Sequence, residues 1–220
     1  MFVKELNIKE FITLKTSDTG LYALDCMTEN KVSHLPIVNN EELLGLISED
    51  DIHNFNQPQE ALGNHVLSLI KPYVLENQHV YDVIKIFGEH KLTLLPVLDK
   101  TKKYLGVLTA SDLLYNLSKF ASYNEPGAII ILELNSNDYS LSEISQIIES
   151  NDAKVLSLYL TSFKDSTKID VTIKINKQDI SSIMQTFNRY DYKIKGTFTE
   201  DDFYDDLVDR YNSLMNYLNV

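Results

Sequence analysis

The sequence predicts an α+β protein in which two tandem β-α-β-β-α repeats pack as a pair and a β-α-β-β-α-β domain follows. Two observations carry this prediction. The phrase "LLGLISEDDI" at residues 43–52 returns as "LGVLTASDLL" at residues 105–114. After residue 126, the apolar positions follow a different order of strands and helices. A chain of 220 residues is long enough for one large domain or two small ones.

The repeat becomes clear when the chain is laid over itself. A shift of 60 residues places "NKVSHLPIV" at residues 30–38 over "HKLTLLPVL" at residues 90–98. The second copy then gains one residue in "DKTKKY", and the offset becomes 61. The coincident pairs are Leu35 with Leu95, Pro36 with Pro96, Gly45 with Gly106, Ser48 with Thr109, and Asp51 with Asp112.

Each copy predicts the same elements in the same order. A short strand at residues 11–14 or 73–75 precedes a helix whose apolar face is Leu21, Leu24 and Met27/Thr28, or Val80, Val83/Ile84 and Phe87. Two strands follow around a polar turn, at residues 33–38 and 43–48, or 93–98 and 104–109. A second helix starts at the Ser/Thr-x-x-Asp. Because one copy is too small for a good core, the two copies are expected to pack on each other.

These motifs resemble the CBS domain, and two in tandem resemble the CBS pair, or Bateman module. The resemblance predicts repeats at residues 2–60 and 61–120. It implies that an adenosyl ligand, such as AMP, ATP, adenosine or S-adenosylmethionine, binds at two sites. The implied contacts to ribose or phosphate are Ser48, Asp51, Thr109 and Asp112, and the implied adenine walls are Leu35, Pro36, Leu95 and Pro96.

The Ser/Thr-x-x-Asp pattern also has a purely structural interpretation. It is a helix capping box, in which the hydroxyl accepts from an early helix N–H and the acid reaches back. The same pattern starts at Ser140 and at Thr199, outside the repeat, where no ligand is implied. Capping and ribose binding are compatible, so the pattern carries information about a ligand only inside the repeat.

The residues inside the motif differ between the two copies. Glu49 and Asp50 separate Ser48 from the motif Asp in the first copy and would repel a phosphate. The first site is therefore expected to suit an uncharged or cationic compound, such as adenosine or S-adenosylmethionine. The second copy has Ala110-Ser111 there, which leaves its ligand undecided. The lysines of its turn, Lys100, Lys102 and Lys103, are expected to face solvent.

The second half, residues 126–198, begins at the Pro126-Gly127 boundary. Its strand, helix, hairpin, helix and strand give a ferredoxin-like order, with a last strand expected to place Tyr192, Ile194, Gly196 and Phe198 on one face. This half resembles an ACT domain, and the whole arrangement resembles the acetoin-utilisation B-type proteins. That family usually has Asn-x-Pro-Gly-x-Leu after the first strand. Here residues 137–141 read "NDYSL", which argues against amino-acid binding at the family's usual place.

The last segment, residues 199–220, is predicted to be an acidic amphipathic helix. Its apolar positions recur every three or four residues at Phe203, Leu207, Tyr211, Leu214 and Leu218. Residues 200–220 contain six acidic residues and one Arg, and so carry −5 of the chain's net charge of −12. Such a helix either packs on its own domain or contributes to a dimer contact.

Several classes of function have no support in the sequence. The net charge of −12 argues against nucleic-acid binding, and no run approaches 18 apolar residues. Phosphate-loop, nucleophile-elbow and dinucleotide fingerprints are absent, the five histidines are scattered, and the single cysteine, Cys26, cannot build a zinc site. We therefore expect a cytoplasmic, non-catalytic sensor that acts as a homodimer on an unknown protein partner, without metal, membrane or nucleic acid. The alternative is a nucleotide-independent dimeric scaffold.

Overall fold

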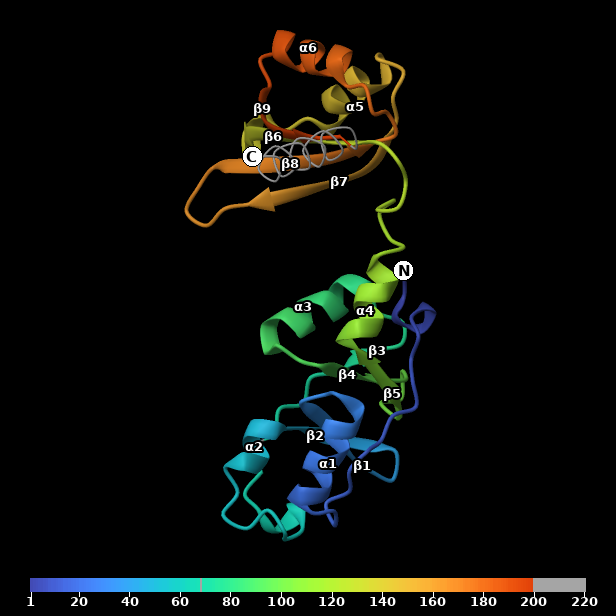
Figure 1. Cartoon of the computed structure of the whole chain (residues 1–220), viewed down its shortest axis with the longest axis vertical. Coiled ribbons are helices and arrows are strands. Elements are labelled where there is room, and N and C mark those ends of the chain that lie inside the picture. Colours follow the sequence, from blue (N-terminus) through green and yellow to red (C-terminus); the bar gives the residue numbers. More distant parts are fainter. Residues whose placement is uncertain (68, 200–220) are drawn as a thin grey trace, which may run out of the picture. The chain divides into compact units, whose positions relative to one another are not determined.

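The computed structural model describes residues 1–67 and 69–199 (Figure 1). The chain divides into two compact units, Met1–Leu117 and Ser118–Val220, which are described separately. The predicted C-terminal helix lies, beyond Thr199, outside the described residues.

The first unit contains the two predicted repeats. The first repeat has the elements η1 (Val3–Glu5), α1 (Gly20–Asn30), β1 (His34–Asn39), β2 (Glu42–Ser48) and α2 (Glu49–His53). The second has η2 (Leu62–Asn64), β3 (Val74–Leu75), α3 (Val80–His90), β4 (Leu94–Leu98), β5 (Tyr104–Thr109) and α4 (Ala110–Leu117). The predicted strand at residues 11–14 is reduced to one parallel bridge between Leu14 and Ile37, whereas its counterpart β3 pairs with β4 at two positions.

The two hairpins of the repeats have matching registers. Leu35 lies opposite Ile47 in the antiparallel pair β1–β2, and Leu95 lies opposite Leu108 in β4–β5. Each hairpin also contains an irregularity at the same place, between Ile37 and Val38 in one and between Val97 and Leu98 in the other. The repeat seen in the sequence is therefore a repeat of backbone geometry.

The segments that lead into the repeats cross over to the other repeat. Lys9, ahead of the first repeat's helix, exchanges two backbone hydrogen bonds with Val107 of β5, each 3.0 Å long. In the same way, the Leu46 N–H of β2 donates to the Ile70 carbonyl at 2.9 Å. One continuous core joins both repeats, including Val3, Leu14, Leu35, Ile47, Val80, Leu95 and Leu108. The prediction that the repeats pack as a pair is confirmed.

The buried face of α1 differs from the predicted one. Leu21 is 49% exposed, and Leu24 is only partly buried. Met27 of the predicted face does enter the core, together with Ala23 and Cys26, and these three follow the i, i+3, i+4 spacing of one helix side. Leu21 precedes Ala23 by two positions, which turns it away from that face. The predicted face of α3 is confirmed at Val80, Val83 and Phe87.

In its described residues, 118–199, the second unit has a four-stranded antiparallel sheet and two α-helices. Its elements are β6 (Ala128–Asn135), η3 (Ser136–Asp138), α5 (Leu141–Glu149), β7 (Val155–Ser162), β8 (Lys168–Ile175), α6 (Ser181–Arg189) and β9 (Lys193–Phe198). The strand order β7-β8-β6-β9 and the element order βαββαβ give the predicted ferredoxin-like topology (Figure 1). Its core lies between sheet and helices and includes Ile130, Leu132, Ile144, Ile173, Ile183 and Phe187.

One prediction for the last strand is wrong. A register shift where β6 meets β9, between Ile131 and Leu132, interrupts the alternation of faces. Ile194 lies opposite buried Leu132, whereas Phe198 lies opposite Ile129 and is 57% exposed. A shift of one residue moves the following side chains to the other face of a sheet. The four residues predicted to share one face of this strand therefore do not do so: Tyr192, Ile194, Gly196 and Phe198.

Candidate functional site

The motif of the first repeat forms a complete capping box at the start of α2. The Asp51 N–H donates to Ser48 Oγ at 3.1 Å, while the Ser48 N–H and Oγ donate to Asp51 Oδ2 at 2.9 and 2.6 Å. The structural interpretation of the motif is therefore confirmed. Among the described residues, no hydrogen bond engages Asp51 Oδ1, so this oxygen is available to a ligand as well.

A cavity of about 170 Å³ opens beside Asp51. Its other lining residues come from the end of α2 and from the segment that enters the second repeat: Asn54, Phe55, Val66, Leu67 and Leu69. Phe55 is held by the His65 ring, which stacks on it with centroids 3.9 Å apart and planes 2° from parallel. An acid with a free oxygen thus faces an apolar, partly aromatic wall. This wall was not predictable from the repeated phrase, because residues outside that phrase supply it.

The Leu-Pro pairs belong to the interior of the first unit rather than to the cavity beside Asp51. Leu35 and Leu95 are fully buried in β1 and β4 and belong to the shared core. Pro36 and Pro96 follow them in the same strands and are also buried. None of the four lines the cavity beside Asp51. Their role as adenine walls stays a prediction.

The motif of the second repeat is capped in the same way but carries an additional ion pair. The Asp112 N–H donates to Thr109 Oγ1 at 3.1 Å, and Thr109 Oγ1 donates to Asp112 Oδ2 at 2.6 Å. The other oxygen, Oδ1, lies 2.7 Å from Lys9 Nζ, which comes from the segment before the first repeat. Both oxygens of Asp112 are therefore engaged.

Burial and bonding act in opposite directions on the Asp112 carboxyl. Burial raises its pKa, but the bonds from Lys9 and Thr109 outweigh this and hold the pKa below its ordinary value of 3.8. The carboxyl is ionised at neutral pH. The lysines of the neighbouring turn take no part in this: Lys100, Lys102 and Lys103 are exposed, and Lys103 pairs with Glu41 at 2.8 Å. Their predicted orientation toward solvent is confirmed.

His34, at the start of β1, connects the two repeats near the first motif. Its Nδ1 accepts from the Thr93 N–H at 3.4 Å and lies 3.1 Å from Thr93 Oγ1. Burial lowers the pKa of His34 below 6.5, although nearby Asp51 and Asp50 oppose this change. Because a backbone N–H points at Nδ1, the neutral ring with the proton on Nε2 fits this contact.

This geometry predicts a pH dependence for the first unit. A histidine whose pKa is lowered by folding stabilises the fold above its unfolded pKa, and this contribution is lost as the pH falls below 6.5 toward the folded value. Calorimetry should therefore show that the melting temperature of the first unit decreases as the pH is lowered from 7.5 to 5. His34→Gln should reduce this slope. Equal slopes in the wild type and His34→Gln would contradict the assignment.

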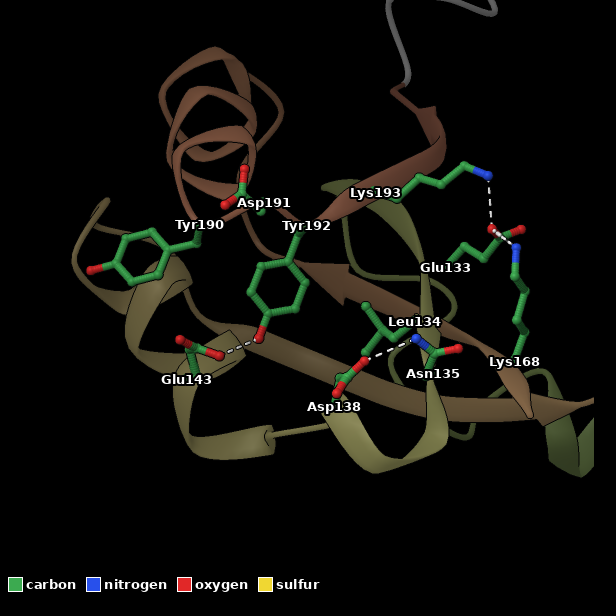
Figure 2. Close-up of a pocket in the computed structure, with 10 residues that line it drawn as sticks. All are labelled: Glu133, Leu134, Asn135, Asp138, Glu143, Lys168, Tyr190, Asp191, Tyr192 and Lys193. Atoms are coloured by element: carbon green, nitrogen blue, oxygen red, sulfur yellow. Dashed lines mark hydrogen bonds and ion pairs between the residues drawn. The ribbon is translucent and has the colours of Figure 1, made fainter.

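A second cavity, of about 420 Å³, lies in the ferredoxin-like unit (Figure 2). At one end, Glu133 Oε1 lies 2.8 Å from Lys168 Nζ and 2.7 Å from Lys193 Nζ. These two ammonium groups lower the pKa of Glu133 to about 2. At the other end, the Tyr192 hydroxyl donates to Glu143 at 2.6 Å, and burial together with this bond raises the pKa of Tyr192. None of these residues was predicted from the sequence to belong to a site.

The described residues support neither a metal centre nor a membrane-spanning segment. Within residues 1–67 and 69–199, no group of three or more His, Cys, Asp or Glu side chains is arranged to hold a metal ion. Over the same residues, every helix is too short or too polar to cross a bilayer.

Comparison with known proteins agrees with the geometry of the first unit. The sequence profile of the CBS domain matches residues 3–56 and 69–119. A CBS domain-containing protein of Dictyostelium discoideum is 31% identical over 134 residues, which cover 54% of this chain and 92% of that protein. An uncharacterised protein of Methanocaldococcus jannaschii is 25% identical over 119 residues, 53% of this chain but 39% of the relative.

Two solved structures are each similar to about half of this chain. A CBS domain pair/ACT domain protein from Thermotoga maritima is 21% identical, with a TM-score of 0.48, and the match covers 54% of this chain and 98% of that one. The CBS domain pair of protein MJ0100, solved in complex with 5′-methylthioadenosine and S-adenosyl-L-methionine, is also 21% identical. That match has a TM-score of 0.46 and covers 54% of this chain and 97% of the other.

The repeated motif, the matching hairpins and the crossed entry segments all lie within the residues that the CBS profile matches. The chain belongs to the CBS-domain family, and its first unit is a CBS-domain pair.

Proposed function

We propose that this chain is a non-catalytic regulatory protein whose CBS pair binds an adenosyl ligand at Asp51 and Asp112. The observation that carries the proposal is the free Oδ1 of Asp51 beside the apolar cavity of Phe55, Leu67 and Leu69. A carboxylate accepts hydrogen bonds from the two hydroxyls of a ribose, and an apolar wall suits a purine ring. Ser48 and Thr109 would hold each acid in place through the capping boxes.

The surroundings of Asp51 favour a ligand without a phosphate. Glu49 and Asp50 follow Ser48 directly and are solvent-exposed, and none of the described Lys or Arg side chains pairs with Asp51. A phosphate there would meet three carboxylates within one helical turn. Like charges a few Å apart cost of order 1 kcal/mol even in water. Adenosine and S-adenosylmethionine are accordingly the compounds proposed for the first site.

The second unit is proposed to be an ACT-like module that passes the bound state on, as in the acetoin-utilisation B-type arrangement. Its strand order supports the proposal. The loop after β6 gives no support for an amino-acid site. Tyr139 packs against the core, and Ser140 caps α5 by accepting from the Glu143 N–H at 3.3 Å. Residues that fill and cap this loop replace the Pro-Gly that would let a ligand approach the backbone.

The proposal includes the homodimer, the cytoplasmic location and the unknown protein partner that the sequence predicts, with no role for nucleic acid. One feature of the second unit favours the alternative, a dimeric scaffold that ignores nucleotides. Strand β7 is an edge of the sheet, and its Tyr159 and Leu160 are 55% and 45% exposed. Among the described residues no further strand pairs with the outer edge of β7, and an edge strand with exposed apolar side chains is a ready surface for pairing with another chain.

Ligand-induced stabilisation distinguishes the two functions. Adenosine, AMP, ATP and S-adenosylmethionine are titrated against the full chain by thermal shift and calorimetry. A ligand at 100 times its Kd should stabilise the first unit by roughly 2.7 kcal/mol. Asp51→Asn and Asp112→Asn should each remove the effect at one site, whereas Asp25→Asn, at an exposed acid of α1, should not. A stable dimer that no adenosyl compound affects at millimolar concentration would favour the scaffold.

A further inference from the structure

The proposed second adenosyl site has a cation, Lys9, beside its motif aspartate. Its ammonium lies 2.7 Å from Asp112 Oδ1, and its side chain is 45% exposed while that of Asp112 is only 12% exposed. Lys9 and Asp112 are far apart in the sequence. The ion pair forms because the entry segment of the first repeat runs along β5 of the second.

The first site has an equivalent backbone position that carries no charge. The Val107 N–H donates to the Lys9 carbonyl, and the Leu46 N–H donates to the Ile70 carbonyl, so Ile70 is the counterpart of Lys9. Leu46 and Val107 are themselves equivalent at the offset of 61 that also relates Asp51 to Asp112. At this position the two sites therefore differ in a single property, a positive charge against an apolar side chain.

Lys9 and a ribose compete for the same oxygen. Thr109 donates to Asp112 Oδ2 and Lys9 pairs with Oδ1, so a diol that bonds to both oxygens of Asp112 meets the Lys9 ammonium at Oδ1. A neutral nucleoside would displace the ammonium and leave it without a partner. A nucleoside phosphate would displace it and offer it a new oxyanion, since the long, flexible lysine stem keeps its head within reach of a neighbouring group.

Resting on the function proposed above, we propose that Lys9 is the specificity-determining residue of the second site and makes it select phosphorylated adenosyl compounds, such as AMP, over adenosine. The first site, with Ile70 in the equivalent position and Glu49 and Asp50 nearby, selects the opposite way. The CBS pair would then bind two different compounds rather than two molecules of the same compound.

The test measures AMP and adenosine affinities by calorimetry on the full chain carrying Asp51→Asn, so that only the second site reports. Lys9→Met should weaken AMP binding about tenfold or more, because a hydrogen bond between charged groups is lost. It should leave adenosine binding unchanged or tighter, because Asp112 Oδ1 becomes free. Lys9→Arg should keep the preference for AMP. Lys85→Met, which removes another exposed lysine paired with an acid in the same unit, should change neither affinity.

Introducing a lysine at the equivalent position of the first site tests the same role. In a chain carrying Asp112→Asn, Ile70→Lys should shift the first site toward AMP. Two outcomes separate the two proposals. If adenosyl compounds bind through Asp112 and Lys9→Met leaves the ratio of AMP to adenosine affinity unchanged, the role of Lys9 is wrong and the proposed function stands. If no adenosyl compound, including ATP and S-adenosylmethionine, binds the wild type at millimolar concentration, the proposed function is wrong, and the role of Lys9 with it.

Discussion

Phe187→Ala is expected to destabilise the ferredoxin-like unit by about 3–5 kcal/mol, the range measured for deleting a buried aromatic ring. Phe187 is fully buried in the last turn of α6 and is among the largest fully buried side chains of the described residues. Its ring meets that of Tyr192 edge to face, with centroids 5.4 Å apart. Because a domain is stable by only about 5–15 kcal/mol, this loss is a large fraction of the total.

Calorimetry of the full chain measures this effect. The transition that belongs to the second unit should move to a lower temperature, and the transition of the CBS pair should not move, since Phe187 belongs to the separate core of the second unit. Phe198→Ala is the matched control, because this ring is 57% exposed and exposed substitutions change stability by less than about 0.5 kcal/mol. Equal effects of the two variants would contradict the packing described.

Gly106→Ala is expected to destabilise the CBS pair by about 3 kcal/mol, through backbone strain and a clash with the entry segment. Gly106 has φ +149°, a conformation that other residues rarely adopt. A Cβ added there would lie 2.4 Å from the Lys9 carbonyl oxygen and 3.1 Å from Ile8 Cγ2. The substitution pushes away the segment that carries Lys9, so it should also reduce any preference of the second site for AMP.

Chemical denaturation of the full chain gives the stability change. Gly88→Ala provides a matched control of opposite sign, because Gly88 lies in α3 and a Cβ there meets nothing within 4 Å. In an open helical position, alanine is favoured over glycine by up to about 1 kcal/mol. A Gly106→Ala protein as stable as the wild type would show that the entry segment moves away from β5 without cost.

Features that depend on neighbouring residues were predictable from the sequence. The capping boxes join Ser48 to Asp51 and Thr109 to Asp112 across three positions, so the spacing alone specifies them. The hairpin strands of both repeats follow from alternating or continuous apolar runs, and their bounds agree closely with the predicted ones. The predicted strand at residues 11–14 is the exception, because only one bridge forms there.

Features that depend on contacts between residues far apart in the sequence were not predictable from it. The Lys9–Asp112 pair requires knowing that the entry segment crosses to the other repeat, and no local spacing records that crossing. The irregular pairing of β6 with β9 turns Phe198 outward, and the alternating sequence of the strand gives no sign of it. The buried face of α1 depends on which side meets the shared core, where small Ala23 fits and Leu21 is left outside.

The crossed entry segments have a thermodynamic consequence. The cavity beside Asp51 is completed by Leu69, which precedes the second repeat's helix, and Asp112 is bonded to Lys9, which precedes the first repeat's helix. A molecule at either position therefore acts on backbone that belongs to both halves of the pair. By linkage, whatever factor the first ligand applies to the affinity of the second, the second applies to the first. One calorimetric titration in each order measures that factor twice, and the two values must agree.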